Sequence, residues 1–264
     1  MASARYRLRA RQATDRDSQG QSEFEPVHDA SGINGLPYEA GTQVTTMKPK
    51  LTIGNKNYST WSLRAWLLLR ESGIEFDEQR ICLDTDTSAS EIAALNAGGT
   101  VPVLQLGDLT VWDSLAIAET VAERWPEKKL WPEDADARAH ARCISAEMHS
   151  GFAVLRDCMP MNCRAMGRQV PLPDALSEDI DRIIAIWSDC HRRFSGERDW
   201  LFGEFSIADA MFAPVVLRFR TYGINLPESA GYYPHRLLES EAMQEWLAAA
   251  ECEIEVIERE EKGR

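Results

Sequence analysis

The sequence lacks the features that would point to a membrane or to a nucleic acid. Its apolar runs are short because charged residues interrupt them. Arg64 and Arg70, for example, lie on either side of Leu67–Leu69, whereas a membrane helix needs about 18 consecutive apolar residues. The 264 residues carry a formal net charge of −13, which disfavours binding to the phosphate backbone of a nucleic acid. We therefore expect neither a membrane nor a nucleic-acid partner.

Paired cysteines are also missing. The six cysteines form no C-x-x-C pair and no cysteine–histidine cluster with the spacing of a zinc site. We therefore expect no bound metal. Scattered single cysteines are typical of a reducing compartment, so they indicate the cytoplasm, with most of them serving as small core residues.

Residues 1–46 lack any sustained apolar periodicity. Arginines precede a stretch rich in Ser, Gln, Asp and Gly, which buries too little surface to offset the entropy of ordering. No apolar segment of a secretory signal is present, and acidic residues argue against an arginine-rich targeting peptide. We predict a disordered N-terminal extension, with Met47 as a natural start of the protein.

The chain does contain a regular alternation of strands and helices between residues 47 and 127. Strands are predicted at residues 51–53, 75–83, 101–106 and 109–112, and helices at 60–71, 90–96 and 113–124. Gly107-Asp108 predicts a hairpin between the last two strands, which distinguishes this order from a doubly wound nucleotide-binding fold. The order β-α-β-α-β-β-α is that of a thioredoxin-like domain.

Beyond a linker at residues 128–136, residues 137–264 are helical in pattern and predict an all-α C-terminal domain. Ser206 and Asp209 have the spacing of a capping box that opens a helix. Apolar residues recur at helical spacing in three sets: Ile144, Met148, Gly151 and Leu155; Ile180, Ile183, Ile184, Trp187 and Phe194; and Met243, Trp246, Leu247, Ala250 and Ile254.

Val101-Pro102-Val103 is followed by Asp113-Ser114 at the start of a predicted helix. A proline between two β-branched residues cannot donate a hydrogen bond into a sheet, and a cis bond there would turn the flanking backbone groups toward a ligand. The acidic residue and the hydroxyl meet unpaired N–H groups of the helix. Together these residues predict a pocket for a small charged peptide.

Four motifs in this order resemble those of the cytosolic glutathione transferase family. Asn96–Val103 is similar to the family's N-P-x-G-x-V-P-V, with Ala97 in place of the proline, and Trp112–Ile117 is similar to its E/D-S-x-A-I. Phe205–Ala210 resembles the helix start of its C-terminal core, and Asn57–Arg64 resembles a bacterial serine-type subgroup related to the zeta class. The resemblance implies a dimeric detoxification enzyme that activates the thiol of glutathione, its co-substrate, for attack on small electrophiles.

The resemblance places Ser59, where the first strand gives way to the first helix, at the catalytic position. A free thiol titrates near pH 8.5, and a hydroxyl donor at a positive helix N-terminus stabilises the thiolate. Thr60 and Ser62 are rival hydroxyls, and Ser59 also fits a simple helix cap. Redox relatives carry C-x-x-C at Ser59–Ser62, so dithiol chemistry has no sulfur here.

The resemblance assigns the rest of the glutathione site to two short segments. Val101 would pair its backbone with the cysteinyl part of glutathione, with Pro102 setting the turn. Asp113 would bind the γ-glutamyl ammonium. Ser114 and the N–H groups of the helix would bind the carboxylate. A capping pair without a ligand is the alternative for the last two residues.

The second substrate is expected against the first helix of the C-terminal domain. His149, Phe152 and Arg156 share a spacing that would line such a face. A structural role explains each of them better: a core position for Phe152, a surface position or an ion pair between domains for Arg156, and a solvated or core histidine for His149.

Two other functions stay open. A maleylacetoacetate or maleylpyruvate isomerase also adds glutathione, but the zeta-like signature has a cysteine two positions after the serine, where this chain has Trp61. A non-catalytic binding or interaction protein of the same fold is the other alternative.

Overall fold

The computed structural model describes residues 48–194 and 198–264, so the predicted extension at residues 1–46 lies outside the described part. Within the described residues, no helix is both long enough and apolar enough to cross a membrane.

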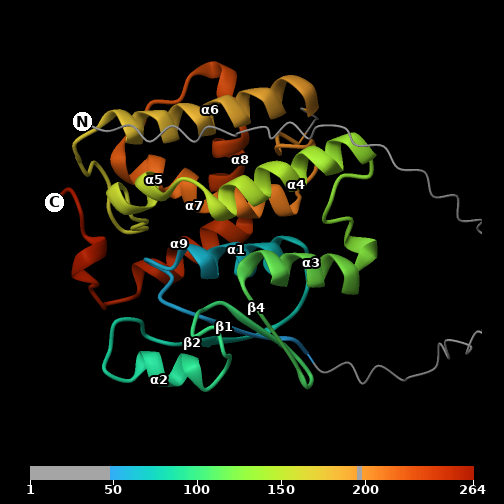
Figure 1. Ribbon diagram of the computed structural model, residues 1–264, viewed down its shortest axis with the longest axis vertical. Coiled ribbons are helices and arrows are strands. Elements are labelled where there is room, and N and C mark those ends of the chain that lie inside the picture. Colours follow the sequence, from blue (N-terminus) through green and yellow to red (C-terminus); the bar gives the residue numbers. More distant parts are fainter. Residues whose placement is uncertain (1–47, 195–197) are drawn as a thin grey trace, which may run out of the picture. The chain divides into compact units, whose positions relative to one another are not determined.

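The first part of the described chain is built on a four-stranded mixed sheet with the strand order β2-β1-β3-β4. β1 runs parallel to β2 and antiparallel to β3, and β3 and β4 form the predicted hairpin. The strands are β1 (Lys50–Ile53), β2 (Asp77–Arg80), β3 (Val103–Leu106) and β4 (Leu109–Trp112). Helices α1 (Thr60–Glu71) and α3 (Ser114–Arg124) lie on one face of the sheet, and α2 (Ser88–Ala93) lies on the other (Figure 1). The thioredoxin-like order is thereby confirmed.

Burial explains the places of the strands. Leu51, Thr52 and Ile53 of β1 are fully buried, as expected of a central strand that is covered on both faces. In β2, by contrast, all of Asp77–Arg80 is exposed, and charged side chains on an edge strand discourage pairing with another chain.

The second part of the described chain is helical. Its helices are α4 (Ala135–Ser150), α5 (Ala153–Cys158), α6 (Asp174–Phe194), α7 (Ile207–Tyr222), α8 (Tyr233–Glu239) and α9 (Glu241–Glu251), with short 3₁₀ turns η1 (Pro126–Lys128), η2 (Glu228–Ala230) and η3 (Glu258–Glu260). The predicted capping box is confirmed, because Ser206 and Asp209 satisfy each other's backbone groups at the start of α7.

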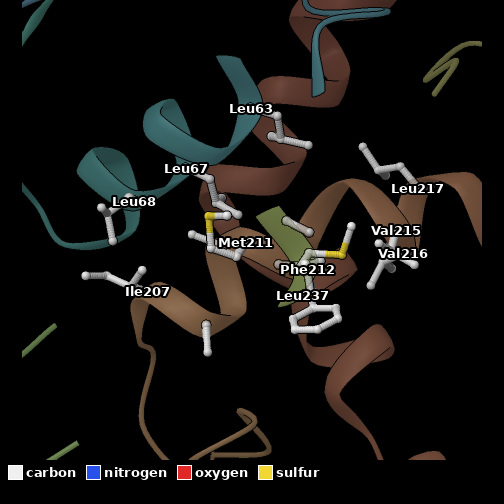
Figure 2. Packing of buried hydrophobic residues seen from close by; sticks show 14 of the residues in the cluster. Leu63, Leu67, Leu68, Ile207, Met211, Phe212, Val215, Val216, Leu217 and Leu237 are labelled. Atoms are coloured by element: carbon white, nitrogen blue, oxygen red, sulfur yellow. The ribbon is translucent and has the colours of Figure 1, made fainter. Parts of the chain in front are cut away.

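Helix α7 joins the two parts. Almost every residue of α7 is buried, and the helix contacts α1, α4 and α8. Leu67 of α1 lies beside Met211 of α7 in a continuous apolar cluster (Figure 2). Because α1 contacts both the sheet and α7, this helix is held from both sides.

Two expectations about the helices are wrong. Ile144, Met148, Gly151 and Leu155 do not lie on one helix, because α4 ends at Ser150 and Phe152 adopts a left-handed conformation with φ of 58° before α5 begins. Apolar spacing does not register such a break. Ile254 does not belong to the last helix, which ends at Glu251, and its side chain is 89% exposed.

Most of the cysteines are not core residues, contrary to the sequence-based expectation. Cys163 and Cys190 are buried, whereas Cys82 and Cys158 are half-buried and Cys143 and Cys252 are exposed. The hydrophobicity of a cysteine therefore does not predict its burial in this chain, although all six cysteines are free.

Candidate functional site

The sheet register brings the predicted glutathione residues to one end of the sheet. Thr52 of β1 pairs with Val103 of β3, which pairs in turn with Trp112 of β4. The loop to Ser59 follows β1, Pro102 directly precedes Val103, and Asp113 directly follows Trp112. Three segments that are separate in sequence therefore meet beside one another.

Ser59 is the N-cap of α1. Its backbone is extended, and its Oγ accepts a hydrogen bond from the Ser62 amide at 3.4 Å and donates one to the Ser62 Oγ at 2.7 Å. The residue is 8% exposed. The hydroxyl thus lies at the positive end of the helix, where a negative charge is stabilised.

The neighbouring hydroxyls are less free. The Ser62 side chain is fully buried, and its Oγ also accepts a hydrogen bond from the Gly54 amide at 3.0 Å. The Tyr58 hydroxyl donates to Glu261 Oε1 at 2.6 Å, and burial raises the pKa of Tyr58. Ser59 and Thr60, each 8% exposed, are the hydroxyls left at this helix start.

The Val101–Pro102 peptide bond is cis, as the sequence suggested. Pro102 is buried and Val101 is half-buried. Outside the sheet ladder, the Val101 amide and carbonyl have no hydrogen-bond partner within residues 48–194 and 198–264. These backbone groups are therefore available to an extended peptide.

Asp113 and Ser114 begin α3. Asp113 has a φ of 73°, and its Oδ1 accepts a hydrogen bond from the Leu115 amide at 2.8 Å. Ser114 is 2% exposed, yet its Oγ has no hydrogen-bond partner in the described part of the chain. An orphaned buried hydroxyl is costly unless a ligand pairs with it, so this position fits the carboxylate of a bound molecule.

His149, at the end of α4, contacts Asp113 directly. Its Nε2 lies 2.8 Å from Oδ1 and 2.7 Å from Oδ2 of Asp113. Since a carboxylate only accepts hydrogen bonds, Nε2 carries the proton. In this structure the carboxylate assigned to the ammonium of the ligand is thus already paired with a side chain of the helical part.

The ring of Trp61 contacts His149 and two arginine side chains. Its ring lies 5.3 Å from the His149 ring, and the guanidinium carbons of Arg64 and Arg156 lie 4.3 and 5.3 Å from its centroid. Burial holds the pKa of Arg64 well below its usual range and also lowers that of Arg156. The tryptophan in place of the zeta-type cysteine is therefore wedged between cationic side chains.

The residues predicted to bind the second substrate are only partly brought together. His149 and Arg156 meet at Trp61, while Phe152 is 7% exposed and belongs to the apolar cluster. Arg156 also donates to the carbonyls of His149 and Gly151, the residue that caps the C-terminus of α4.

Arg64 contacts Trp61 in this region, but it was not among the predicted site residues. Its position in an otherwise apolar helix gave no sequence signal of this contact. In the described residues, no group of three or more metal-ligating side chains is found.

Replacing His149 by alanine is expected to strengthen glutathione binding about three- to fivefold, because the ligand's ammonium no longer competes with the imidazole for the Asp113 carboxylate, a solvent-accessible contact worth up to about 1 kcal/mol. Titration calorimetry measures this directly. His235→Ala, on α8, serves as the control. Weaker binding by the His149 variant would show instead that the imidazole orients Asp113 for the ligand.

Comparison with known proteins gives a consistent picture. Residues 58–124 match the family described as "Glutathione S-transferase, N-terminal domain". The maleylacetoacetate isomerase of Rattus norvegicus is 27% identical over 183 residues, which are 68% of this chain and 82% of that protein. A stringent starvation protein A homologue of Coxiella burnetii is 20% identical over 79% of this chain and 96% of that protein.

The fold has a close parallel among solved structures. A glutathione transferase homologue from Burkholderia GL BGR1, whose crystal structure holds bound glutathione, superposes with a TM-score of 0.59 and 24% identity over 78% of this chain and 99% of that one. A likeness at this identity establishes the fold of a thioredoxin-like domain followed by an all-α domain.

Proposed function

We propose that this chain, whose residues 58–124 match the glutathione S-transferase N-terminal domain family, is a glutathione transferase that uses Ser59 to activate the thiol for attack on small electrophiles. The observation that carries the proposal is the placement of the Ser59 hydroxyl at the start of α1. The same end of the sheet holds the cis-Pro102 turn and the orphaned hydroxyl of Ser114.

The chemistry follows from these positions. The Val101 backbone would hold the cysteinyl part of glutathione, while Asp113 and Ser114 would hold its γ-glutamyl ammonium and carboxylate. The thiol proton leaves to solvent, and the Ser59 hydroxyl turns from Ser62 to donate to the thiolate. Each unit by which the thiol pKa falls corresponds to about 1.4 kcal/mol of stabilisation of the thiolate. The sulfur then forms a bond to the electrophilic carbon, and the leaving group departs with the displaced electron pair.

We propose a wider setting as well. Residues 47–127 and 137–264 act as two domains joined by the linker at 128–136, and the electrophile lies between them, near His149 and Arg156. The enzyme works without a metal, as a homodimer in the cytoplasm, in detoxification.

A glutathione-dependent isomerase of the maleylacetoacetate type is the second candidate. The likeness to the rat maleylacetoacetate isomerase favours it, whereas Trp61 in place of the signature cysteine speaks against it. Conjugation of a chloronitrobenzene with release of chloride supports the transferase, and turnover of a maleyl keto acid without net loss of glutathione supports the isomerase. Binding of glutathione with neither activity would indicate a non-catalytic protein of this fold.

Replacing Asp113 by asparagine tests the glutathione site. Asparagine keeps the helix cap but loses the charge that pairs with the ammonium, and a hydrogen bond to a charged group contributes about 1.5–3 kcal/mol. We therefore expect about 10- to 100-fold weaker binding of glutathione by calorimetry, with a much smaller change in kcat at saturating glutathione. Asp108→Asn, in the exposed turn between β3 and β4, is the matched control. Equal affinities of the two variants would refute the assignment of Asp113.

A further inference from the structure

The loop between β1 and α1 is held by residues that follow the last helix. Glu253 is buried, and its Oε1 accepts a hydrogen bond from the Lys56 amide at 2.7 Å while its Oε2 accepts one from the Asn57 amide at 3.0 Å. Arg80 of β2 lies 3.1 Å from the same carboxylate. One side chain, almost 200 residues away in sequence, thus binds two successive amides just before Ser59.

Arg164 ties the same loop to the same C-terminal segment. Its backbone amide donates to Asn57 Oδ1 at 3.0 Å, and its guanidinium donates to the Tyr58 hydroxyl at 3.0 Å. The guanidinium also donates to the carbonyls of Glu253 and Glu255. The loop and the segment after α9 are therefore one hydrogen-bonded unit.

The same loop is hydrogen-bonded to Ser59, the candidate thiol activator. The Ser59 amide donates to the Asn55 carbonyl at 2.8 Å, and the Tyr58 amide donates to the same oxygen at 3.3 Å. The turn that contains Lys56 and Asn57 therefore sets where Ser59 begins α1. A displacement of a catalytic group by about 1 Å is enough to cost about 100-fold in rate.

We infer that Glu253 is a positioning residue, which fixes the Lys56 and Asn57 amides and thereby the Ser59 hydroxyl and the start of α1. For its catalytic consequence, the inference rests on the proposed function. For the placement of the loop, it stands on the hydrogen bonds alone. A buried carboxylate with two amides and a guanidinium around it has its lone pairs satisfied, so a substitution there is felt by the loop.

Glu253→Gln is the test, because glutamine keeps the size of the side chain but offers an NH₂ group to one of the two amides. Glu255→Gln is the matched control, since Glu255 lies in the same segment and also pairs with Arg80, at 2.8 Å. We expect amide hydrogen exchange at Lys56, Asn57 and Ser59, followed by NMR, to become at least about tenfold faster in the first variant and to stay unchanged in the second.

The same variants are compared by the ultraviolet absorbance of bound glutathione as a function of pH. We expect Glu253→Gln to raise the pKa of the bound thiol by about one unit, which lowers the thiolate fraction and kcat about tenfold at a pH below both thiol pKa values. At such a pH the Kd for glutathione should change less than about twofold, because the bound thiol is protonated in both proteins and the residues at Pro102 and α3 are untouched. Glu253→Asp, which keeps both acceptor oxygens, should recover part of each effect and serves if the glutamine variant does not fold.

The outcomes separate the inference from the proposed function. If the folded Glu253 variants show the exchange rates and the thiol pKa of the Glu255 control, the inference is overturned. If the unmodified protein produces no thiolate of bound glutathione, the proposed function fails. Hydrogen exchange then decides alone, with faster exchange in Glu253→Gln supporting the positioning of the loop and unchanged exchange overturning it.

Discussion

Replacing Ser59 by alanine is expected to lower kcat/KM for conjugation about 10- to 100-fold, because the thiolate no longer accepts a hydrogen bond from the Ser59 hydroxyl. A hydrogen bond to a charged group contributes about 1.5–3 kcal/mol. The hydroxyl that would donate this bond lies at the start of α1 and points at Ser62 in the free protein. A steady-state assay with a chloronitrobenzene measures the loss, and the pH profile should shift toward higher pH as the thiol pKa rises.

Two variants make the Ser59 result specific. Ser59→Thr keeps a hydroxyl and a capping side chain, so it should recover most of the activity that alanine removes. Thr60→Ala removes the rival hydroxyl at the same helix start and should change kcat/KM by less than about twofold. A larger loss in Thr60→Ala than in Ser59→Ala would move the role of thiolate donor to Thr60.

Replacing Asp209 by alanine is expected to destabilise the protein by at least about 3 kcal/mol, since each buried donor left without a partner costs about 1–3 kcal/mol. The carboxylate is fully buried and accepts hydrogen bonds from the Leu201 amide at 2.9 Å and from the amide and hydroxyl of Ser206, each at 2.8 Å. Urea unfolding measures the loss. Asp174→Ala, exposed in the first turn of α6, should stay within about 0.5 kcal/mol.

The Asp209 effect also carries a pH dependence. Burial raises the pKa of Asp209 to about 7, above its ordinary value of 3.8. The folded protein therefore holds a proton on this group more tightly than the unfolded chain does. The part of its contribution to the free energy of unfolding that comes from this tighter proton binding is fully present below about pH 4 and is lost as the pH rises through 7, whereas the three hydrogen bonds to the side chain remain. Asp209→Asn, which cannot titrate, should lack this part of the pH dependence. A pH dependence equal to that of the unmodified protein would contradict this account of Asp209.

Local patterns were enough to predict the order of the strands and helices and the local geometry at several residues of the candidate site. The hairpin at Gly107-Asp108, the cap at Ser59 and the box of Ser206 and Asp209 each involve residues only a few positions apart, so the sequence contains both partners side by side. Pro102 could also be singled out from the sequence, because the missing backbone N–H is a property of proline itself and needs no partner.

Partners that lie far apart in the chain could not be predicted in this way. His149 pairs with Asp113 across 36 positions, and Glu253 binds amides of the β1–α1 loop at separations of 196 and 197. Helical spacing also failed between α4 and α5, where the left-handed Phe152 interrupts the helix. His149 and Arg156 therefore lie on two different helices, and Phe152 packs in the apolar cluster.

The strand and helix order, the helix caps and the turn at Pro102 could be predicted from residues that are near neighbours in the chain. These follow from local backbone sterics and from hydrogen bonds between near neighbours. The folded chain was needed to show that three separate segments share one end of the sheet, that His149 pairs with Asp113, and that Glu253 binds two amides of the loop before Ser59. A buried polar side chain needs a hydrogen-bond partner, but which distant group lies within reach depends on how the whole core packs.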